Sequence, residues 1–179
     1  IEEILADFNF EKPYKNIQQL LKIHSKIKAL KPGHWRTVKL KEVTNLIQYC
    51  LGLRLQFNTS KPTGVANTLT EITLKALNPS PIKVSIEKIV DAVNLDTKQS
   101  LSKNKAWQEI KSILLPKVQT TPYWLIEKGD IGNYKVSNPD LKGLAETPNP
   151  IQAIFELNID GNLILINVPL TFRSTDRVK

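Results

Sequence analysis

Residues 151–172, IQAIFELNIDGNLILINVPLTF, decide the fold class. Apolar and polar residues alternate on both sides of the central Asp160-Gly161 pair, which is the spacing of strands with one buried face. Asp-Gly between two such runs favours a two-residue type I′ turn, because both central residues of that turn need a positive φ angle. The stretch therefore predicts an antiparallel hairpin with strands over Ile151–Ile159 and Asn162–Phe172.

The same alternation occurs in three shorter runs earlier in the sequence. Turn residues such as Asn78-Pro79-Ser80-Pro81 separate them. Residues 106–115 fit either a helix or a bulged strand, and we favour the strand. Short strands, turns and 11 prolines together predict a mainly β fold, an immunoglobulin-like antiparallel β-sandwich over residues 53–179. The three runs are Leu53–Phe57, Ile72–Ala76 and Ile82–Ile86.

The first part of the sequence has a helical period instead. From Ile17 to Leu30, apolar residues recur every three or four positions until a Lys-Pro-Gly break. A second run covers Leu40 to Leu51 and ends at Gly52, which suits a left-handed cap. Residues 1–52 are therefore predicted to form a helical hairpin, with a short helical lead-in over residues 1–8. Such a hairpin is too small to be stable alone, so we expect it to dock on the sandwich.

The charge balance argues against a nucleic-acid partner. The chain has 179 residues with 25 Lys and Arg against 17 Asp and Glu, a net charge of +8. Residues 1–50 and residues 51–179 each have a net charge of +4, so the surplus is divided between the two parts. Neither an arginine-rich cluster nor an aromatic RNA-binding motif accompanies it. A solvated lysine-rich surface is the favoured interpretation.

The hydropathy and the first residue of the sequence lead to one expectation each, about membrane spans and about the parent protein. The longest stretch without a charged residue runs from Gly161 to Phe172, well short of the roughly 20 residues that a membrane-spanning helix needs. No membrane span is therefore expected. The sequence begins with Ile1 and contains no Met, which suggests a segment of a longer protein.

Residues able to perform catalysis are sparse. The single cysteine, Cys50, excludes an intrachain disulfide and a cysteine-built zinc site, and its helical spacing predicts a buried apolar position. His24 falls on a helical apolar face and His34 in a turn, neither beside a second metal ligand. Nucleophile-elbow, dinucleotide and phosphate-loop motifs are absent. We expect a noncatalytic segment without metal or cofactor; a hydrolase with a site centred on His24 or His34 stays an open alternative.

Two aromatic motifs supply the candidate ligand or docking residues. Tyr123 and Trp124 follow a Thr-Pro turn and either stack on a sugar or partner, or fill the edge of the core with their polar tips bonded to backbone. Core filling is favoured. His34, Trp35 and Arg36 lie between the two helices, where they either anchor the docking of the helices or form a contact site; docking is favoured.

Six motifs occur in a fixed order along the chain: His34-Trp35-Arg36, Tyr49–Leu53, the strands of Leu74–Ile86 around Asn78-Pro79-Ser80, Thr121-Pro122-Tyr123-Trp124-Leu125, Gly143–Glu146, and Val168–Arg173 with Asp176. In order and spacing they resemble the region that follows the catalytic domain in large bacterial PIG-L (LmbE-like) deacetylases. The Thr-Pro-Tyr-Trp-Leu segment is the most specific piece, and the resemblance covers most of the chain.

The resemblance implies a division of labour. The family's catalytic domain is a Rossmann-like zinc hydrolase that deacetylates N-acetylglucosamine-like substrates, and its His-Pro-Asp-Asp-type motif does not occur in residues 1–179. No catalytic residue can therefore be transferred to this sequence. The chain would be an accessory domain that docks on its own upstream catalytic domain, with a further β-domain downstream and carbohydrate as additional partners. The resemblance also suggests an exported or periplasmic location. A purely structural spacer or a protein-interaction module without a ligand is the alternative.

Overall fold

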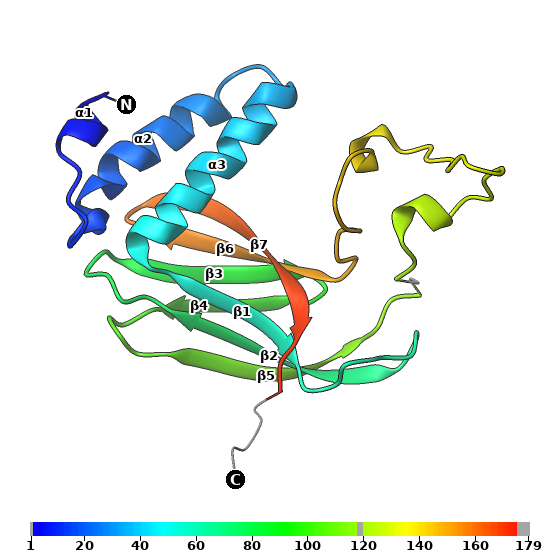
Figure 1. Ribbon diagram of the computed structural model, residues 1–179. Coiled ribbons are helices and arrows are strands. Elements are labelled where there is room, and N and C mark those ends of the chain that lie inside the picture. The colour runs from blue at the N-terminus through cyan, green and yellow to red at the C-terminus, as the bar shows by residue number, and fades with distance from the viewer. Residues whose placement is uncertain (1, 118–119, 175–179) are drawn as a thin grey trace, which may run out of the picture.

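A computed structural model describes residues 2–117 and 120–174 as an N-terminal helical part followed by a seven-stranded sheet (Figure 1). Ile1 and Asp176 lie outside the described residues. The helices are α1 (Glu2–Ala6), α2 (Ile17–Lys28) and α3 (His34–Leu51), with short 3-10 turns at Pro13–Asn16, Tyr123–Leu125 and Pro139–Leu141. The strands are β1 (Arg54–Thr59), β2 (Leu69–Leu77), β3 (Val84–Asp91), β4 (Leu95–Ser100), β5 (Trp107–Leu114), β6 (Gln152–Ile159) and β7 (Asn162–Phe172).

The helical pair is confirmed, with one correction at its centre. The helices α2 and α3 lie side by side, joined by the short connection at Pro32-Gly33 (Figure 1). Gly52 ends α3 with φ +64°, and its N–H donates to the carbonyls of Gln48 and Tyr49, as a left-handed cap requires. However, α3 begins at His34 rather than near Leu40, because no Pro or Gly follows Gly33 until Gly52. The motif at 34–36 is therefore the first turn of a helix.

The hairpin that the sequence predicted is present. Strands β6 and β7 pair antiparallel from Gln152 opposite Pro169 to Ile159 opposite Asn162. Asp160 and Gly161 connect them with φ angles of +46° and +86°, the two positive values of a type I′ turn. Strand β5 confirms the strand interpretation of residues 106–115. Strand β4 was not anticipated, because its polar sequence LDTKQS lacks a run of apolar residues.

The expected two-sheet sandwich is wrong: the strands form one strongly curled mixed sheet, a half-barrel, in the order β4-β3-β6-β7-β1-β2-β5. Strand β7 pairs with β6 as far as Pro169, and from Leu170 onward it also pairs, in parallel, with β1. A single strand therefore joins both halves of the sheet, whereas a sandwich keeps its two sheets apart. The switch occurs next to Pro169, which has no N–H for a ladder hydrogen bond.

The core fills the inside of this curl and continues beneath the helices. Alternate residues of β2, β3, β6 and β7 are buried, and so is one face of α2 and α3. The helices cover the end of the sheet that holds the β6–β7 turn, where the Gln18 amide donates to the Asp160 carboxylate. The largest fully buried side chains are Phe57, Phe155, Ile17, Leu21, Ile47, Leu51, Ile72, Leu74, Ile86, Ile89, Leu157 and Ile159.

Between β5 and β6 the chain leaves the sheet. Residues 120–150 extend to the side of the sheet and contain only two short 3-10 turns and an isolated bridge between Asp130 and Asn133 (Figure 1). None of their side chains is fully buried. The Tyr123-Trp124 motif belongs to this excursion, so its rings do not fill the edge of the sheet core.

Candidate docking groove on the helical pair

An apolar groove of about 890 Å³ lies between the N-terminal lead-in and the helices α2 and α3. The lead-in, residues 2–16, passes alongside the helical pair (Figure 1). Apart from Asn16, Arg36, Lys39 and Glu42, every residue lining the groove is apolar. The lining residues are Ile4, Leu5, Phe8, Phe10, Asn16, Leu20, Ile23, Ile27, Leu30, Trp35, Arg36, Lys39, Glu42, Val43, Leu46 and Cys50.

The groove exists because each helix carries more apolar surface than the sheet covers. On each helix one row of apolar residues is buried in the core. A second, less buried row on the neighbouring face lines the groove together with Leu20 and Val43 of the first row. A helix that packs on one partner needs a single apolar stripe. The buried row is Ile17, Leu20, Leu21, Val43, Ile47 and Leu51, and the second row is Ile23, Ile27, Leu30, Leu46 and Cys50.

Several large apolar side chains at the groove are exposed to solvent. Phe10 is 90% exposed, Trp35 71% and Leu46 50%, and Leu5 and Leu30 are also exposed. Phe10 meets Phe8 edge to face, with ring centroids 5.0 Å apart. Single exposed apolar residues are ordinary, but a contiguous group of them marks a surface used for interaction.

A buried polar atom at the groove lacks a partner. Asn16 is 3% exposed; its amide nitrogen donates to Gln19 Oε1 at 3.1 Å, while its Oδ1 accepts no hydrogen bond from the described residues. An unsatisfied buried acceptor costs about 1–3 kcal/mol. Asn16 precedes α2 and its side chain does not cap the helix, so its position is not explained by capping.

The groove lies in a basic part of the chain, and its own charged lining residues are Arg36, Lys39 and Glu42. Residues 12–52 contain nine Lys and Arg but a single acidic residue, Glu42. Glu42 pairs with Lys39 at 2.8 Å across one helical turn. The Arg36 guanidinium donates to the Lys28 carbonyl at 2.8 and 3.3 Å, which ties the start of α3 to the end of α2. The positive charge of this region is thus much denser than the even division between residues 1–50 and 51–179 indicated.

Two titratable groups of the helices have shifted pKa values. Burial lowers the pKa of His24 below its ordinary value, and the positive charge of Lys28 lowers it further. Burial also raises the pKa of the Cys50 thiol. Burial therefore favours the neutral form of both side chains. His24 is buried as predicted, and Cys50 is half-buried between the core and the groove.

The five candidate ligand or docking residues lie in two separate places: His34, Trp35 and Arg36 at the helical pair, and Tyr123 and Trp124 beyond the sheet. Trp35 and Arg36 line the groove, and His34 meets Trp35 edge to face at 5.4 Å. Trp35 is too exposed to anchor the helices on the sheet. The sequence analysis missed Phe10, Asn16, Leu30 and Leu46. For Leu30 and Leu46 the signal was available in the second apolar row, but spacing alone does not say which row the sheet covers. Phe10 and Asn16 lie outside that row and had no such signal.

Tyr123 and Trp124 line a separate, shallow hollow of about 380 Å³ together with Tyr134 and Lys142. The Tyr123 and Trp124 rings meet edge to face with centroids 4.9 Å apart, and both are partly exposed. The Tyr123 hydroxyl donates to the Leu144 carbonyl at 3.0 Å, an exposed hydrogen bond within residues 120–150. Tyr134 was not anticipated, since no motif surrounds it.

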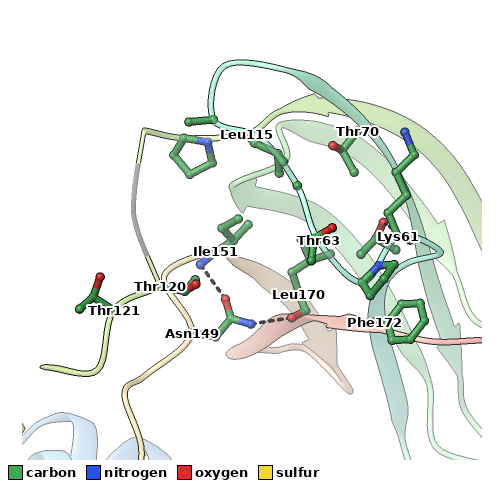
Figure 2. Close-up of a pocket in the computed structure, with 15 residues that line it drawn as sticks. Lys61, Thr63, Thr70, Leu115, Thr120, Thr121, Asn149, Ile151, Leu170 and Phe172 are labelled. Carbon is green, nitrogen blue, oxygen red and sulfur yellow. Dashed lines mark hydrogen bonds between the residues drawn. The ribbon is translucent and has the colours of Figure 1, made fainter.

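A third hollow, of about 620 Å³, lies at the end of the sheet where β1, β5 and β7 approach residues 120–121 (Figure 2). Asn149 organises its floor: its amide donates to the Leu170 carbonyl at 2.6 Å and its Oδ1 accepts from the Ile151 N–H at 2.9 Å. The other polar lining groups are mainly threonines and Lys61. This set offers hydrogen bonds but no nucleophile–base pair.

Within residues 2–117 and 120–174, no cluster of three or more His, Cys, Asp or Glu side chains is placed to hold a metal ion. Over the same residues, no helix has both the length and the apolar character to cross a membrane.

Comparisons with known proteins add little. No family profile matches this chain, and no curated protein sequence matches it. Among solved structures, it is similar to the Pseudomonas fluorescens alkylpurine DNA glycosylase AlkC bound to DNA containing an abasic site analog, at 7% identity and a TM-score of 0.26. That similarity covers 95% of this chain, and the chain spans about half the length of the glycosylase. A similarity at this level carries no argument about fold or function.

Proposed function

We propose that this chain is a noncatalytic protein-interaction module that docks on a neighbouring protein domain through the groove of its helical pair. The observation that carries the proposal is the apolar surface of Phe10, Leu30, Trp35 and Leu46, which the sheet leaves uncovered. Burying such a surface against a partner is favourable, and aromatic side chains at its centre are typical of the residues that dominate binding.

The resemblance to PIG-L-type deacetylases supplies a specific partner for this proposal. In that arrangement residues 1–52 would be the connector, residues 53–179 the accessory β-domain, and the neighbour the upstream zinc-dependent deacetylase domain. The motif at 34–36, which contributes to the resemblance, also contributes Trp35 and Arg36 to the groove. Zinc and the catalytic residues would then belong to that neighbour, and the present chain would contribute binding surface alone.

Site-specific photocrosslinking in the full-length protein, in its native cell, tests the docking. A benzophenone amino acid replaces Trp35, and in a matched control it replaces Tyr49, which is equally exposed on the same helix but does not line the groove. We expect one identified polypeptide segment to be crosslinked at position 35 and not at position 49. Absence of a specific adduct at position 35 would leave a structural spacer as the better description and would overturn the proposal.

Carbohydrate binding at the aromatic hollow is a second candidate function. The partly exposed rings of Tyr123 and Trp124, beside Tyr134, favour it, because aromatic rings stack on the apolar faces of sugars. Calorimetric titration with N-acetylglucosamine oligosaccharides tests it on the same chain. Binding that Trp124→Ala abolishes would support a sugar site, and the absence of heat with the unmodified chain would reject it.

A further inference from the structure

We infer that the groove receives an acidic amphipathic helix of the partner protein. This inference rests on the proposed docking function and specifies the chemistry of the partner. Its first support is shape. The helices α2 and α3 lie side by side, and a third helix packs its ridge of side chains into the depression between two such helices.

The chain's own lead-in shows this type of packing at one end of the groove. Ile4 of the short helix α1 packs against the core, and Leu5 lines the groove. The first eleven residues of the sequence include four acidic residues and no Lys or Arg, while residues 12–52 include nine basic residues and one acidic residue. An acidic helical segment thus already lies beside the basic pair, but α1 is only five residues long and leaves Leu30, Trp35 and Leu46 uncovered.

Charge complementarity extends along the remaining groove. On α2, Lys26 is a surface neighbour of Ile23 and Leu30, three and four residues away. On α3, Arg36 and Lys39 line the groove. Lys39 is the one basic residue of α2 and α3 that forms an ion pair within the described part of the chain. A helix with acidic residues beside its apolar stripe would complement the others.

The same charges disfavour a second copy of this chain as the occupant, because face-to-face contact would bring two basic helical pairs together.

Two helical peptides of about 18 residues, the length of α3, test the inference with the intact chain. Both have Leu at every third or fourth position; one has Glu and the other Lys at the flanking positions. Binding is measured by the anisotropy of labelled peptide, and location by the protection of Cys50, the only thiol, from alkylation. We expect the Glu peptide to bind at least about tenfold more tightly at low salt, with the difference shrinking at about 1 M salt.

Leu46→Glu in the groove should abolish binding of the Glu peptide, whereas Leu163→Glu on β7, at nearly the same exposure, should not alter it. Circular dichroism checks that both variants remain folded. Equal binding of the two peptides, binding of neither, or a dimer that protects Cys50 without peptide would each overturn the inference. A crosslink at position 35 combined with failure of both peptides would reject the acidic helix and leave the docking function standing. Absence of any crosslink would reject the docking function itself.

Discussion

The two apolar faces of the helical pair differ in what covers them rather than in composition. Ile47 and Leu46 are adjacent in the sequence and nearly equal in size, yet Ile47 is completely buried against the sheet and Leu46 is half exposed at the groove. The inner face stabilises the fold of this chain. The outer face retains apolar surface that the fold does not use, which is the expected condition of a binding surface before its partner arrives. Substitutions on the two faces should therefore separate stability from binding.

The largest expected effect is at the inner face. Ile47→Ala removes a side chain from the closed core and should lower the free energy of unfolding by about 2–5 kcal/mol. Leu46→Ala, its matched control, should lower it by less than about 1 kcal/mol, since its side chain is half in solvent. Urea denaturation followed by circular dichroism measures both. Equal losses would contradict the distinction between the two faces.

The next largest loss of stability is expected at Gly52, where the helices join the sheet. Gly52→Ala should cost about 1–2 kcal/mol from the left-handed backbone, and more because its Cβ would lie 2.9 Å from Pro79 Cγ. Gly161→Ala is the control, with a similar positive φ but no atom within 4 Å of the added Cβ. Thermal denaturation should show the larger decrease for Gly52→Ala. A larger decrease for Gly161→Ala would show that contact with Pro79 is unimportant.

On the inner face, His24 should make the stability of the chain depend on pH. Because burial lowers the pKa of His24, the unfolded state binds a proton at a higher pH than the folded state does. Stability should therefore fall as pH decreases below about 6.5, the ordinary histidine pKa, towards the lower folded value. Denaturant midpoints measured from pH 7.5 to pH 5 should decline less in His24→Gln than in the unmodified chain. Identical pH profiles would assign the decline to other groups.

The smallest change in the free energy of unfolding is expected at Asn16, which lines the groove. Asn16→Leu exchanges an amide with an unpartnered oxygen for an apolar group of similar size, so the free energy of unfolding should stay within about 1 kcal/mol of the original or rise. Asn58→Leu provides the contrast, because Asn58 Oδ1 accepts from the Thr171 hydroxyl at 2.8 Å and that bond would be lost. Chemical denaturation of both variants should show the loss at position 58 alone. A loss at position 16 would mean that its amide bond to Gln19 is the more important interaction.

Local signals predicted local structure well. The Asp160-Gly161 turn, the Gly52 cap and the helical period of α2 each depend on neighbouring residues, and all are present. Sheet closure depends on distant pairing: Asn58 and Thr171 are hydrogen bonded across 113 positions, and alternation in either strand does not identify the other. The sandwich prediction was wrong for that reason.

Part of the groove lining could be predicted from the sequence, because helical spacing is also a local signal. Spacing identified apolar rows on both helices, and the motif at 34–36 drew attention to Trp35 and Arg36. Which row the sheet covers, and that Asn16 lies buried beside the other, depend on how the helices sit on the curled sheet. Those are tertiary properties, and no local pattern carries them.

The position of β7 has a consequence for the order in which this protein becomes structured during synthesis. Of the seven strands, β7 is synthesised last, and it is the one that joins β6 to β1. Until β7 is made, β1-β2-β5 and β4-β3-β6 are not joined by strand pairing and have open edges. A chain truncated after Gly161 should therefore bind a hydrophobic dye and resist folding. The sheet can therefore close only after β7 has been synthesised, because the closing contact is long-range.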